Sequence, residues 1–377
     1  MNNTILDSNK NFDRIVFWEP SLSPHKIDLI NSLKSINENI EVIYLAANGI
    51  SDERKALGWS EKGFKDCIVN PNEAIIYKLL TEDSENTMHI FSGIKGGEMY
   101  DIALPILKRK KINFCILSEP RANEGVKGFL RYLDSFFFEN WIRKKVCHVF
   151  AIGANGPKWY ESVCYPENKI SYYAYFISEK YYSELPIIEN SVLNIGFVGR
   201  LIEEKGFFDF INSSLYLNEQ NYNYTVIGSG YGGKYLNDNI SKYSNINYLG
   251  AIEMSFIPKE ISKLDILVLP SHTTDDGWGM VISEALMAGC YVITTKKVGA
   301  SLLMFAPEIG QIVDIKAPKA IADAIDLARK NNFLSLEMKQ KRKKWALENL
   351  SSNKGASFLY DKINGKKTEK IFFSKFF

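Results

Sequence analysis

The chain has 377 residues, of which 46% are hydrophobic and 24% charged, a composition that excludes a disordered or fibrous protein. That length exceeds what a single hydrophobic core usually reaches, so we expect two domains. The 46 basic and 44 acidic residues leave a net charge of +2, which argues against nucleic acid as a partner of the whole surface.

The cysteines and the terminal segments indicate the cellular compartment in which the protein is expected. The five cysteines are widely spaced and lie mostly in apolar runs, which predicts buried, reduced thiols and a cytoplasmic protein. The first twelve residues lack the basic start and apolar stretch of a signal peptide, and no run reaches the roughly 18 apolar residues that cross a bilayer. The tail GKKTEKIFFSKFF is compatible with peripheral contact at the inner face of the cell membrane, or with packing as a last amphipathic segment.

In the first half, short apolar runs alternate with stretches of helical period. The predicted strands are residues 14–18, 41–45, 89–92, 112–117, 146–152 and 170–175, and the predicted helices are residues 24–35, 72–80, 98–109 and 157–163. This alternation is typical of a parallel sheet with helices on both faces. We therefore expect an N-terminal Rossmann-like domain over residues 1–185.

A polar stretch over residues 183–191 predicts a linker, after which a second alternating series begins. Its predicted strands are residues 192–198, 224–227, 246–249, 266–269, 291–294 and 311–313, and its helices are residues 207–217, 279–288 and 319–330. This series predicts a second Rossmann-like domain over residues 192–345.

The charged stretch 335–350 predicts a long helix, and residues 346–377 are expected to form a C-terminal helix and tail that pack back on the N-terminal domain. The expected fold class is α/β, with two doubly wound parallel-sheet domains facing each other across a cleft.

Two cations follow the first strand of the second series, in the segment IGFVGRLIEEKG. Arg200 and Lys205 would lie at the carboxyl edge of the sheet, where they could grip a diphosphate without a metal ion. A solvated loop with two surface cations would give the same pattern. In TVIGSG, Gly228 and Gly230 follow the next strand and allow a ligand to approach the backbone, although an ordinary tight turn also has this spacing.

The segment LPSHTTDDGWGMVISEALMAG places Asp276 at the mouth of a helix and Glu284 two turns into it. Carboxylates accept vicinal sugar hydroxyls, and backbone amides over residues 277–280 would point at a ligand at the helix end. The alternative makes Asp276 a helix cap and Glu284 a solvated position. Glu284, however, lies in a mainly apolar helix, where an unpaired carboxylate would be costly.

The segments FVGRLIEEKG, VIGSG, YLG, DILVLPS and DDGWGMVISEALMAG resemble, in order and spacing, the donor-binding half of the family 4 retaining glycosyltransferases. These are GT-B proteins of the bacterial polysaccharide-type glycosyl transferase group 1. The resemblance is specific over roughly residues 192–300, while in the first half FWEPSLSPHKIDLINSL resembles the opening strand, loop and helix. It implies that the domain over residues 1–185 binds the acceptor and that the domain over residues 192–345 binds the donor. The implied donor substrate is a nucleotide-diphosphate sugar, and no further cofactor is implied.

By this resemblance, Arg200 and Lys205 would bind the donor diphosphate and stabilise the charge of the leaving nucleotide. Glu284 would hold the ribose hydroxyls, and Asp276 would contact the transferred sugar from a position where the family has glutamate. The shorter side chain implies a different donor sugar or a weakened activity. The remaining implied donor-binding residues are Gly199, Gly228, Gly230, Ile252, Gly277, Trp278, Gly279 and Met280.

In the first half, many family members have a histidine after the strand that here ends CILSEP. Glu119 stands there as a candidate catalytic residue that orients sugar or acceptor, unless it pairs with Arg121. His25 is a candidate acceptor-binding residue.

The four histidines show no metal-ligand spacing, so no metal site is predicted. His89 and His148 fall inside apolar strand patterns and are expected in the core. His272 either lines the cleft or lies in a surface loop.

The resemblance therefore implies a metal-independent retaining hexosyltransferase of surface polysaccharide biosynthesis. It would move a hexosyl unit from a UDP-sugar, a GDP-sugar or another nucleotide sugar to a hydroxyl of a saccharide or lipid-linked saccharide. Two alternatives stay open. One is a non-catalytic nucleotide-sugar-binding subunit of a transferase complex, which is compatible with aspartate at position 276 in place of the family's glutamate. The other is a sugar-nucleotide epimerase of the same fold.

Overall fold

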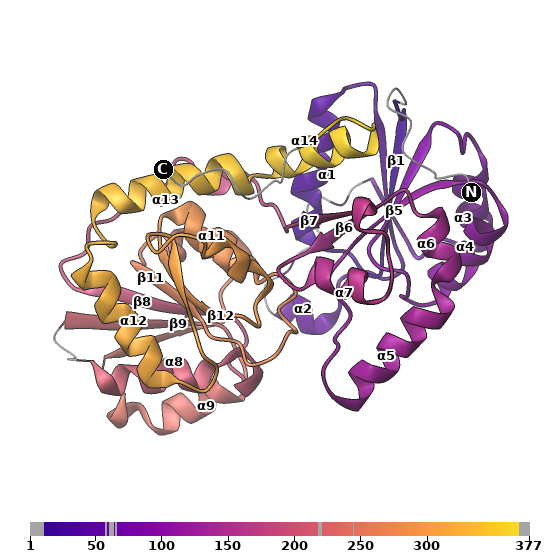
Figure 1. The fold of residues 1–377 in the computed structure, drawn as a ribbon. Coiled ribbons are helices and arrows are strands. Elements are labelled where there is room, and N and C mark those ends of the chain that lie inside the picture. The colour runs from indigo at the N-terminus through magenta and orange to yellow at the C-terminus, as the bar shows by residue number, and fades with distance from the viewer. Residues whose placement is uncertain are drawn as a thin grey trace. The chain divides into compact units, whose positions relative to one another are not determined.

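The computed structural model describes residues 11–56, 59, 64, 66–217, 221–243 and 245–368, so the tail over residues 369–377 lies outside it. The chain divides into two compact units. The first contains the described residues up to Lys55, those between Ser60 and Phe176, and those from Ser352 onward, while Ile177–Ser351 make up most of the second. Figure 1 follows the chain through both units by colour.

The first unit is built on seven parallel strands in the order β3-β2-β1-β4-β5-β6-β7. Its elements are β1 Arg14–Glu19, α1 Pro24–Ile36, β2 Glu41–Ala46, α2 Asp52–Ala56, β3 Cys67–Val69, α3 Glu73–Thr81, β4 Thr87–Phe91, α4 Glu98–Arg109, β5 Asn113–Ser118, α5 Gly125–Phe138, α6 Asn140–Lys145, β6 His148–Ile152, α7 Gly156–Ser162, β7 Ile170–Tyr173 and α14 Ser352–Ile363. Every residue of β4 and β6 is buried, because helices cover both faces of a parallel sheet.

Helix α14 belongs to the first unit, although it follows the second unit in sequence, and it lies along α1 (Figure 1). The hydroxyl of Ser32 donates to that of Ser352 at 2.8 Å, and the Tyr173 hydroxyl donates to the Gly355 carbonyl at 3.0 Å. A Cβ at Gly355 would come within 2.3 Å of the Phe176 ring, so only glycine allows this approach.

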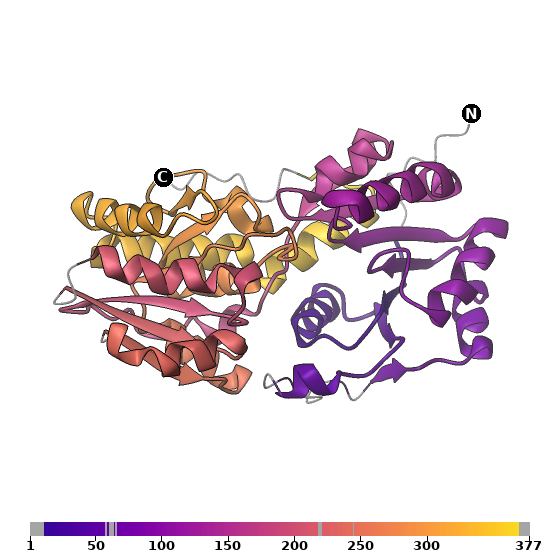
Figure 2. The same ribbon diagram turned by 90° about the horizontal axis from the view of Figure 1, so that it is seen from below.

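The second unit contains six parallel strands in the order β10-β9-β8-β11-β12-β13. Its elements are β8 Leu193–Val198, α8 Phe207–Ser213, β9 Tyr222–Ile227, α9 Tyr231–Asp238, β10 Ile246–Gly250, α10 Ile257–Ile261, β11 Ile266–Leu269, α11 Met280–Ala288, β12 Tyr291–Thr295, β13 Gly310–Val313, α12 Pro318–Lys330 and α13 Leu336–Leu350. Helix α8 packs on α12 and α11 packs on α13, and Figure 2 shows helices enclosing these strands.

The predicted α/β fold class is confirmed, and each predicted strand and helix has a counterpart with ends shifted by a few residues. The predicted helix 207–217 ends earlier, at Ser213, and continues as a short 3-10 turn. Elements α2, β3, α5 and α6 of the first unit and α9 and α10 of the second were not predicted from the sequence. Strand β3 is only three residues long, and α5 turns its apolar residues outward. Among the described residues, no helix is long and apolar enough to span a membrane.

Two lysines of α13 fasten the polar stretch 183–191 to the second unit. Lys339 forms an ion pair with Asp265 and donates to the Ile188 carbonyl at 2.7 Å, while Lys343 donates to the Leu185 carbonyl at 2.5 Å. Lys339 and Asp265 are almost fully buried, with side chains 4% and 1% exposed. The predicted linker is thus held against α13 by charged groups inside the second unit.

The buried pair predicts a large effect on stability. Replacing Lys339 by alanine should lower the free energy of unfolding of the second unit by about 3–5 kcal/mol, because Asp265 would stay buried without its cation. Lys341 lies on the same helix and pairs with Glu337 at the surface at 2.8 Å, so its replacement by alanine should lower the free energy of unfolding far less, because exposed ion pairs contribute little. Urea unfolding of both variants measures the difference, and equal losses would contradict this account.

Candidate functional site

The candidate site of the second unit lies where its strand order reverses. From β8 the chain runs outward through β9 and β10, and from β11 it runs the other way through β12 and β13. The loops after β8 and β11 therefore begin side by side at the carboxyl edge of the sheet, where doubly wound sheets bind ligands. These loops cover residues 199–206 and 270–279.

Two predicted site residues meet across these loops. Lys205 forms an ion pair with Asp276, whose second carboxylate oxygen accepts from the Ser271 hydroxyl at 2.5 Å. The two charged side chains are 12% and 13% exposed, so the pair is largely shielded from water. Gly279 occupies the cap position of α11, so the alternative in which Asp276 caps this helix is wrong.

The other predicted cation, Arg200, is exposed next to Gly199 at the end of β8. The site thus offers one solvent-facing guanidinium and one ammonium that is already held by a carboxylate. A diphosphate bound between these loops could be contacted by both cations, the arginine in bidentate fashion.

The glycines of the loops leave no room for side chains between the backbones. Gly228 has φ 136° and its N–H donates to the Gly250 carbonyl at 2.8 Å. A Cβ at Gly228 would lie 1.8 Å from the Gly199 carbonyl oxygen, and one at Gly206 would lie 2.1 Å from the Pro270 carbonyl oxygen. The loops after β8, β9 and β11 therefore pack backbone against backbone. Gly230 follows at φ 147°, and Ile252 lies partly buried after β10.

The entrance to α11 is fixed by a buried tryptophan. The Trp278 side chain is fully buried, and its indole N–H donates to the Ser283 hydroxyl at 2.9 Å. The Asp276 carbonyl accepts from the Gly299 N–H at 3.0 Å, and the Trp278 carbonyl accepts from the Ala300 N–H at 2.8 Å. The loop from Gly277 to Met280 is therefore held rigidly, and Trp278 can contribute to ligand binding only through its backbone.

Glu284, two turns into α11, has a neighbour that the sequence analysis missed. Burial raises the pKa of Glu284 to about 7, and the nearby Tyr182 hydroxyl lowers it in part. Tyr182 is itself 1% exposed, and burial next to the Glu284 carboxylate raises the pKa of Tyr182 well above its usual value. At neutral pH the Glu284 carboxyl is therefore poised between its two charge states.

His272 lies close to the turn that carries Lys205. Its Nε2 is 2.7 Å from a carboxylate oxygen of Asp209, its Nδ1 is 3.5 Å from Glu203, and its backbone N–H donates to the Glu204 carbonyl at 2.8 Å. The side chain is 7% exposed, so a surface-loop histidine is excluded. His272 joins the loop after β11 to α8 and to the turn before it.

In the first unit, a buried charged cluster lies between β1 and β4, where the strand order also reverses. Lys26 and Glu19 form an ion pair at 3.2 Å with side chains 6% exposed, and the Ser92 hydroxyl donates to Glu19. The sequence analysis missed this cluster. The sequence feature that could have indicated it is Glu19, a glutamate at the end of an otherwise mainly apolar strand.

The predicted residues of the first unit lie near the same sheet edge. Glu119 follows β5 and interacts with the Tyr175 hydroxyl, while Arg121 donates to Asp134 at 2.7 Å and to Ser135 at 2.8 Å. Burial, with the nearby charge of Arg54, lowers the pKa of His25 to about 4, so this ring is neutral at pH 7.

His89 and His148 are buried in β4 and β6, as predicted. Within the described ranges, no group of three His, Cys, Asp or Glu side chains could hold a metal ion.

Comparison with known proteins finds a family similarity within the second unit. Residues 188–345 match the family model described as glycosyl transferases group 1. The capsular polysaccharide biosynthesis glycosyltransferase CapM of Staphylococcus aureus is 28% identical over 227 residues, covering 58% of this chain and 54% of CapM. The match thus spans about half the length of this curated relative.

Solved structures agree in fold over nearly the whole chain. HepE from Anabaena, in complex with UDP, has a TM-score of 0.72 at 14% identity and covers 93% of this chain and 99% of HepE. A glycosyltransferase from Rickettsia africae has a TM-score of 0.67 at 16% identity, covering 94% of this chain and 99% of its own.

The resemblance to group 1 glycosyltransferases is therefore confirmed, while the narrower family 4 assignment stays a prediction. Residues 188–345 match the family model of the glycosyl transferases group 1, in a chain that has the GT-B fold of two parallel-sheet units.

Proposed function

We propose that this protein is a metal-independent, retaining hexosyltransferase of the family 4 type. It would move a hexosyl unit from a nucleotide-diphosphate sugar to a hydroxyl of a saccharide or lipid-linked saccharide in surface polysaccharide biosynthesis, in the cytoplasm. The observation that carries the proposal is the meeting of Lys205 and Asp276 at the strand-order switch of a group 1 glycosyltransferase domain, with Glu284 in the adjoining helix.

The donor would bind in the second unit. Arg200 and Lys205 would contact the diphosphate, and Glu284 would accept the two ribose hydroxyls when it is ionised. Gly228, Gly230 and Ile252 would border the base. The UDP bound to HepE, which shares this fold, supports a uridine nucleotide as the first donor to test.

Catalysis in this proposal is electrostatic. When the bond between the anomeric carbon and the diphosphate oxygen breaks, negative charge grows on the leaving nucleotide, and the Lys205 ammonium would stabilise it in a site shielded from water. The acceptor hydroxyl would attack the same face of the sugar, and its proton would pass to the departing phosphate. No side chain is then needed as a strong base.

Asp276 would have two tasks in this scheme. Its contact with Lys205 orients the ammonium before the donor binds, and its carboxylate would then contact a hydroxyl of the transferred sugar. Because aspartate is one methylene shorter than glutamate, the sugar must lie closer to the loop after β11. In the first unit, Glu119 would orient the sugar or the acceptor, and His25 would bind the acceptor.

The product itself provides the test. The full chain is incubated with UDP-glucose or UDP-galactose and a panel of glycosides with apolar aglycones, with EDTA present, and the linkage is read by proton NMR. The proposal predicts an α-linked product from the α-linked donor at an undiminished rate in EDTA. A β-linked product would refute retention, and a need for added metal would refute metal independence. Donor binding without turnover on any acceptor would favour a non-catalytic subunit instead.

A further inference from the structure

Helix α5 of the first unit turns its apolar face to solvent. Val126, Phe129, Leu130 and Phe137 are 78%, 60%, 59% and 65% exposed. At 100° per residue these four positions fall within about 100° of one another around the helix axis, so they form one continuous stripe. We call it the α5 stripe. An apolar stripe of this width normally faces a core.

The opposite face of α5 is the one that packs. Gly128 and Ser135 are buried there, and a Cβ at Gly128 would lie 2.1 Å from the Asn123 backbone. Arg121 donates to the Ser135 hydroxyl at 2.8 Å, and Arg143 donates to the Ser135 and Phe136 carbonyls at 3.0 and 2.8 Å. These bonds fix the rotation of the helix, so the outward stripe is built into the fold.

An amphipathic cavity adjoins the C-terminal end of the stripe. It encloses about 620 Å³ between α4 and the α5–α6 segment, and Leu104, Pro105, Phe138 and Trp141 form its apolar wall. Lys108 and Arg109 also line it and begin the exposed run Lys-Arg-Lys-Lys at residues 108–111. Asp134 and Glu139 line the cavity as well, but Asp134 forms ion pairs with Lys95 and Arg121, and the Glu139 side chain is almost fully buried. The exposed charges beside the apolar wall are therefore mainly cationic, and Lys127 and Lys144 add exposed cations nearby along the chain.

We propose that the α5 stripe and the adjoining cavity dock the protein on an anionic membrane surface. The helix would lie in the plane of the interface, with its phenylalanines at the acyl boundary and the 108–111 run at the lipid phosphates. Exposed apolar surface of this kind marks an interaction site, and its cationic border complements an anionic bilayer. A symmetric contact between two copies would instead bring two such basic runs together, which like-charge repulsion opposes.

Vesicle flotation of the full chain tests this proposal without reference to transferase activity. The protein is expected to float with phosphatidylcholine vesicles that contain phosphatidylglycerol, and to do so less at about 0.5 M salt, where surface charges are screened. The double variant Phe129→Ser, Phe137→Ser should bind roughly tenfold more weakly or worse, because two aromatic side chains no longer enter the interface. Both positions are solvent-exposed, so its melting temperature should match that of the wild type.

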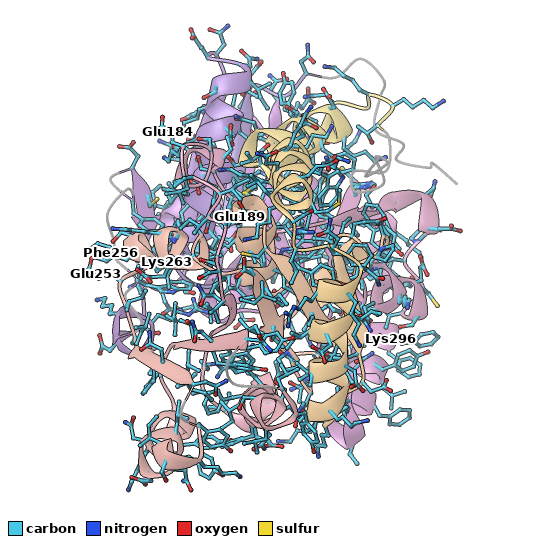
Figure 3. The ribbon with its side chains drawn as sticks, turned by 90° about the vertical axis from the view of Figure 1, so that its left-hand side faces the viewer. Glu184, Glu189, Glu253, Phe256, Lys263 and Lys296 are labelled. Carbon is cyan, nitrogen blue, oxygen red and sulfur yellow. The ribbon has the colours of Figure 1, made fainter. Side chains whose placement is uncertain are left out.

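Phe256 supplies the matched control, since it is a phenylalanine of the second unit that is 56% exposed and lies at the surface beside Glu253 (Figure 3). Phe256→Ser should float like the wild type. A second full-length variant, Phe372→Ser with Phe373→Ser, addresses the tail. Absence of wild-type binding, or full binding by the α5 double variant, would overturn the proposal. So would loss of binding through the tail variant alone, or a dimer that the α5 substitutions dissociate while vesicle binding persists.

Discussion

Replacing Lys205 by alanine is expected to lower kcat/KM for glycosyl transfer by about two to three orders of magnitude. Lys205 would supply the positive charge that faces the leaving diphosphate, and its ion pair with Asp276 sets the position of that charge before the donor arrives. The loss should fall mainly on kcat, because the charge on the leaving group grows toward the transition state. Steady-state kinetics with saturating acceptor separates kcat from KM.

Lys263 provides the control for this experiment. It pairs with Glu260 at 2.6 Å and precedes β11, whereas Lys205 follows β8, so the two lysines lie at opposite edges of the same parallel sheet. Lys263→Ala should keep the wild-type kcat/KM. A Lys205→Ala variant with wild-type kinetics would remove Lys205 from the proposed site. The melting temperatures of both variants establish that any loss is not a loss of fold.

The affinity for UDP-glucose is expected to increase about tenfold between pH 6 and pH 8. Burial raises the pKa of Glu284 to about 7, so at pH 6 most molecules carry a neutral carboxyl, which is a weaker acceptor for ribose hydroxyls than the carboxylate. Glu284→Gln should bind more weakly at pH 8 and show little dependence on pH. Titration calorimetry with UDP-glucose at both pH values measures this.

The contribution of Glu284 to the free energy of unfolding should change with pH in the opposite direction to the affinity. The pKa of Glu284 is higher in the folded chain than in the unfolded chain, so the folded state binds more protons between about pH 4.5 and 7. The contribution of Glu284 to the free energy of unfolding therefore decreases as pH rises through this window, and Glu284→Gln should remove that decrease. Tyr182→Phe removes the hydroxyl that lowers this pKa, so it should move both profiles to higher pH. Identical pH profiles in wild type and Glu284→Gln would contradict the role of Glu284.

Rules that a sequence carries predict that Lys205 and Asp276 lie at the same edge of the sheet, but not that the two side chains pair. Both residues come after strands with continuous apolar patterns, and parallel strands bring their carboxyl ends to one edge. The strand pattern alone does not say which two strands are neighbours at the switch. That β8 lies next to β11 depends on the packing of all six strands.

The side chains that contact the site residues could not be predicted from the sequence by these rules. Tyr182 lies in a polar stretch without periodicity, and only folding brings its hydroxyl to Glu284. The Lys26–Glu19 pair likewise depends on a helix start meeting a strand end. The apolar periodicity of α5 indicates a helix, but it does not reveal that the apolar face points to solvent, because that orientation depends on the hydrogen bonds by which Arg121 and Arg143 hold the opposite face inward.

The central claim is that the second unit binds a nucleotide sugar at the strand-order switch without a metal ion. Its most direct test is thermal unfolding of the full chain in EDTA with UDP-, GDP-, ADP- and CMP-sugars beside NAD. A ligand that binds only the folded state raises the melting temperature by mass action. We predict that one nucleotide family raises it in the wild type and does so less in Lys205→Ala. Stabilisation by NAD alone, or an equal shift in both proteins, would contradict the account.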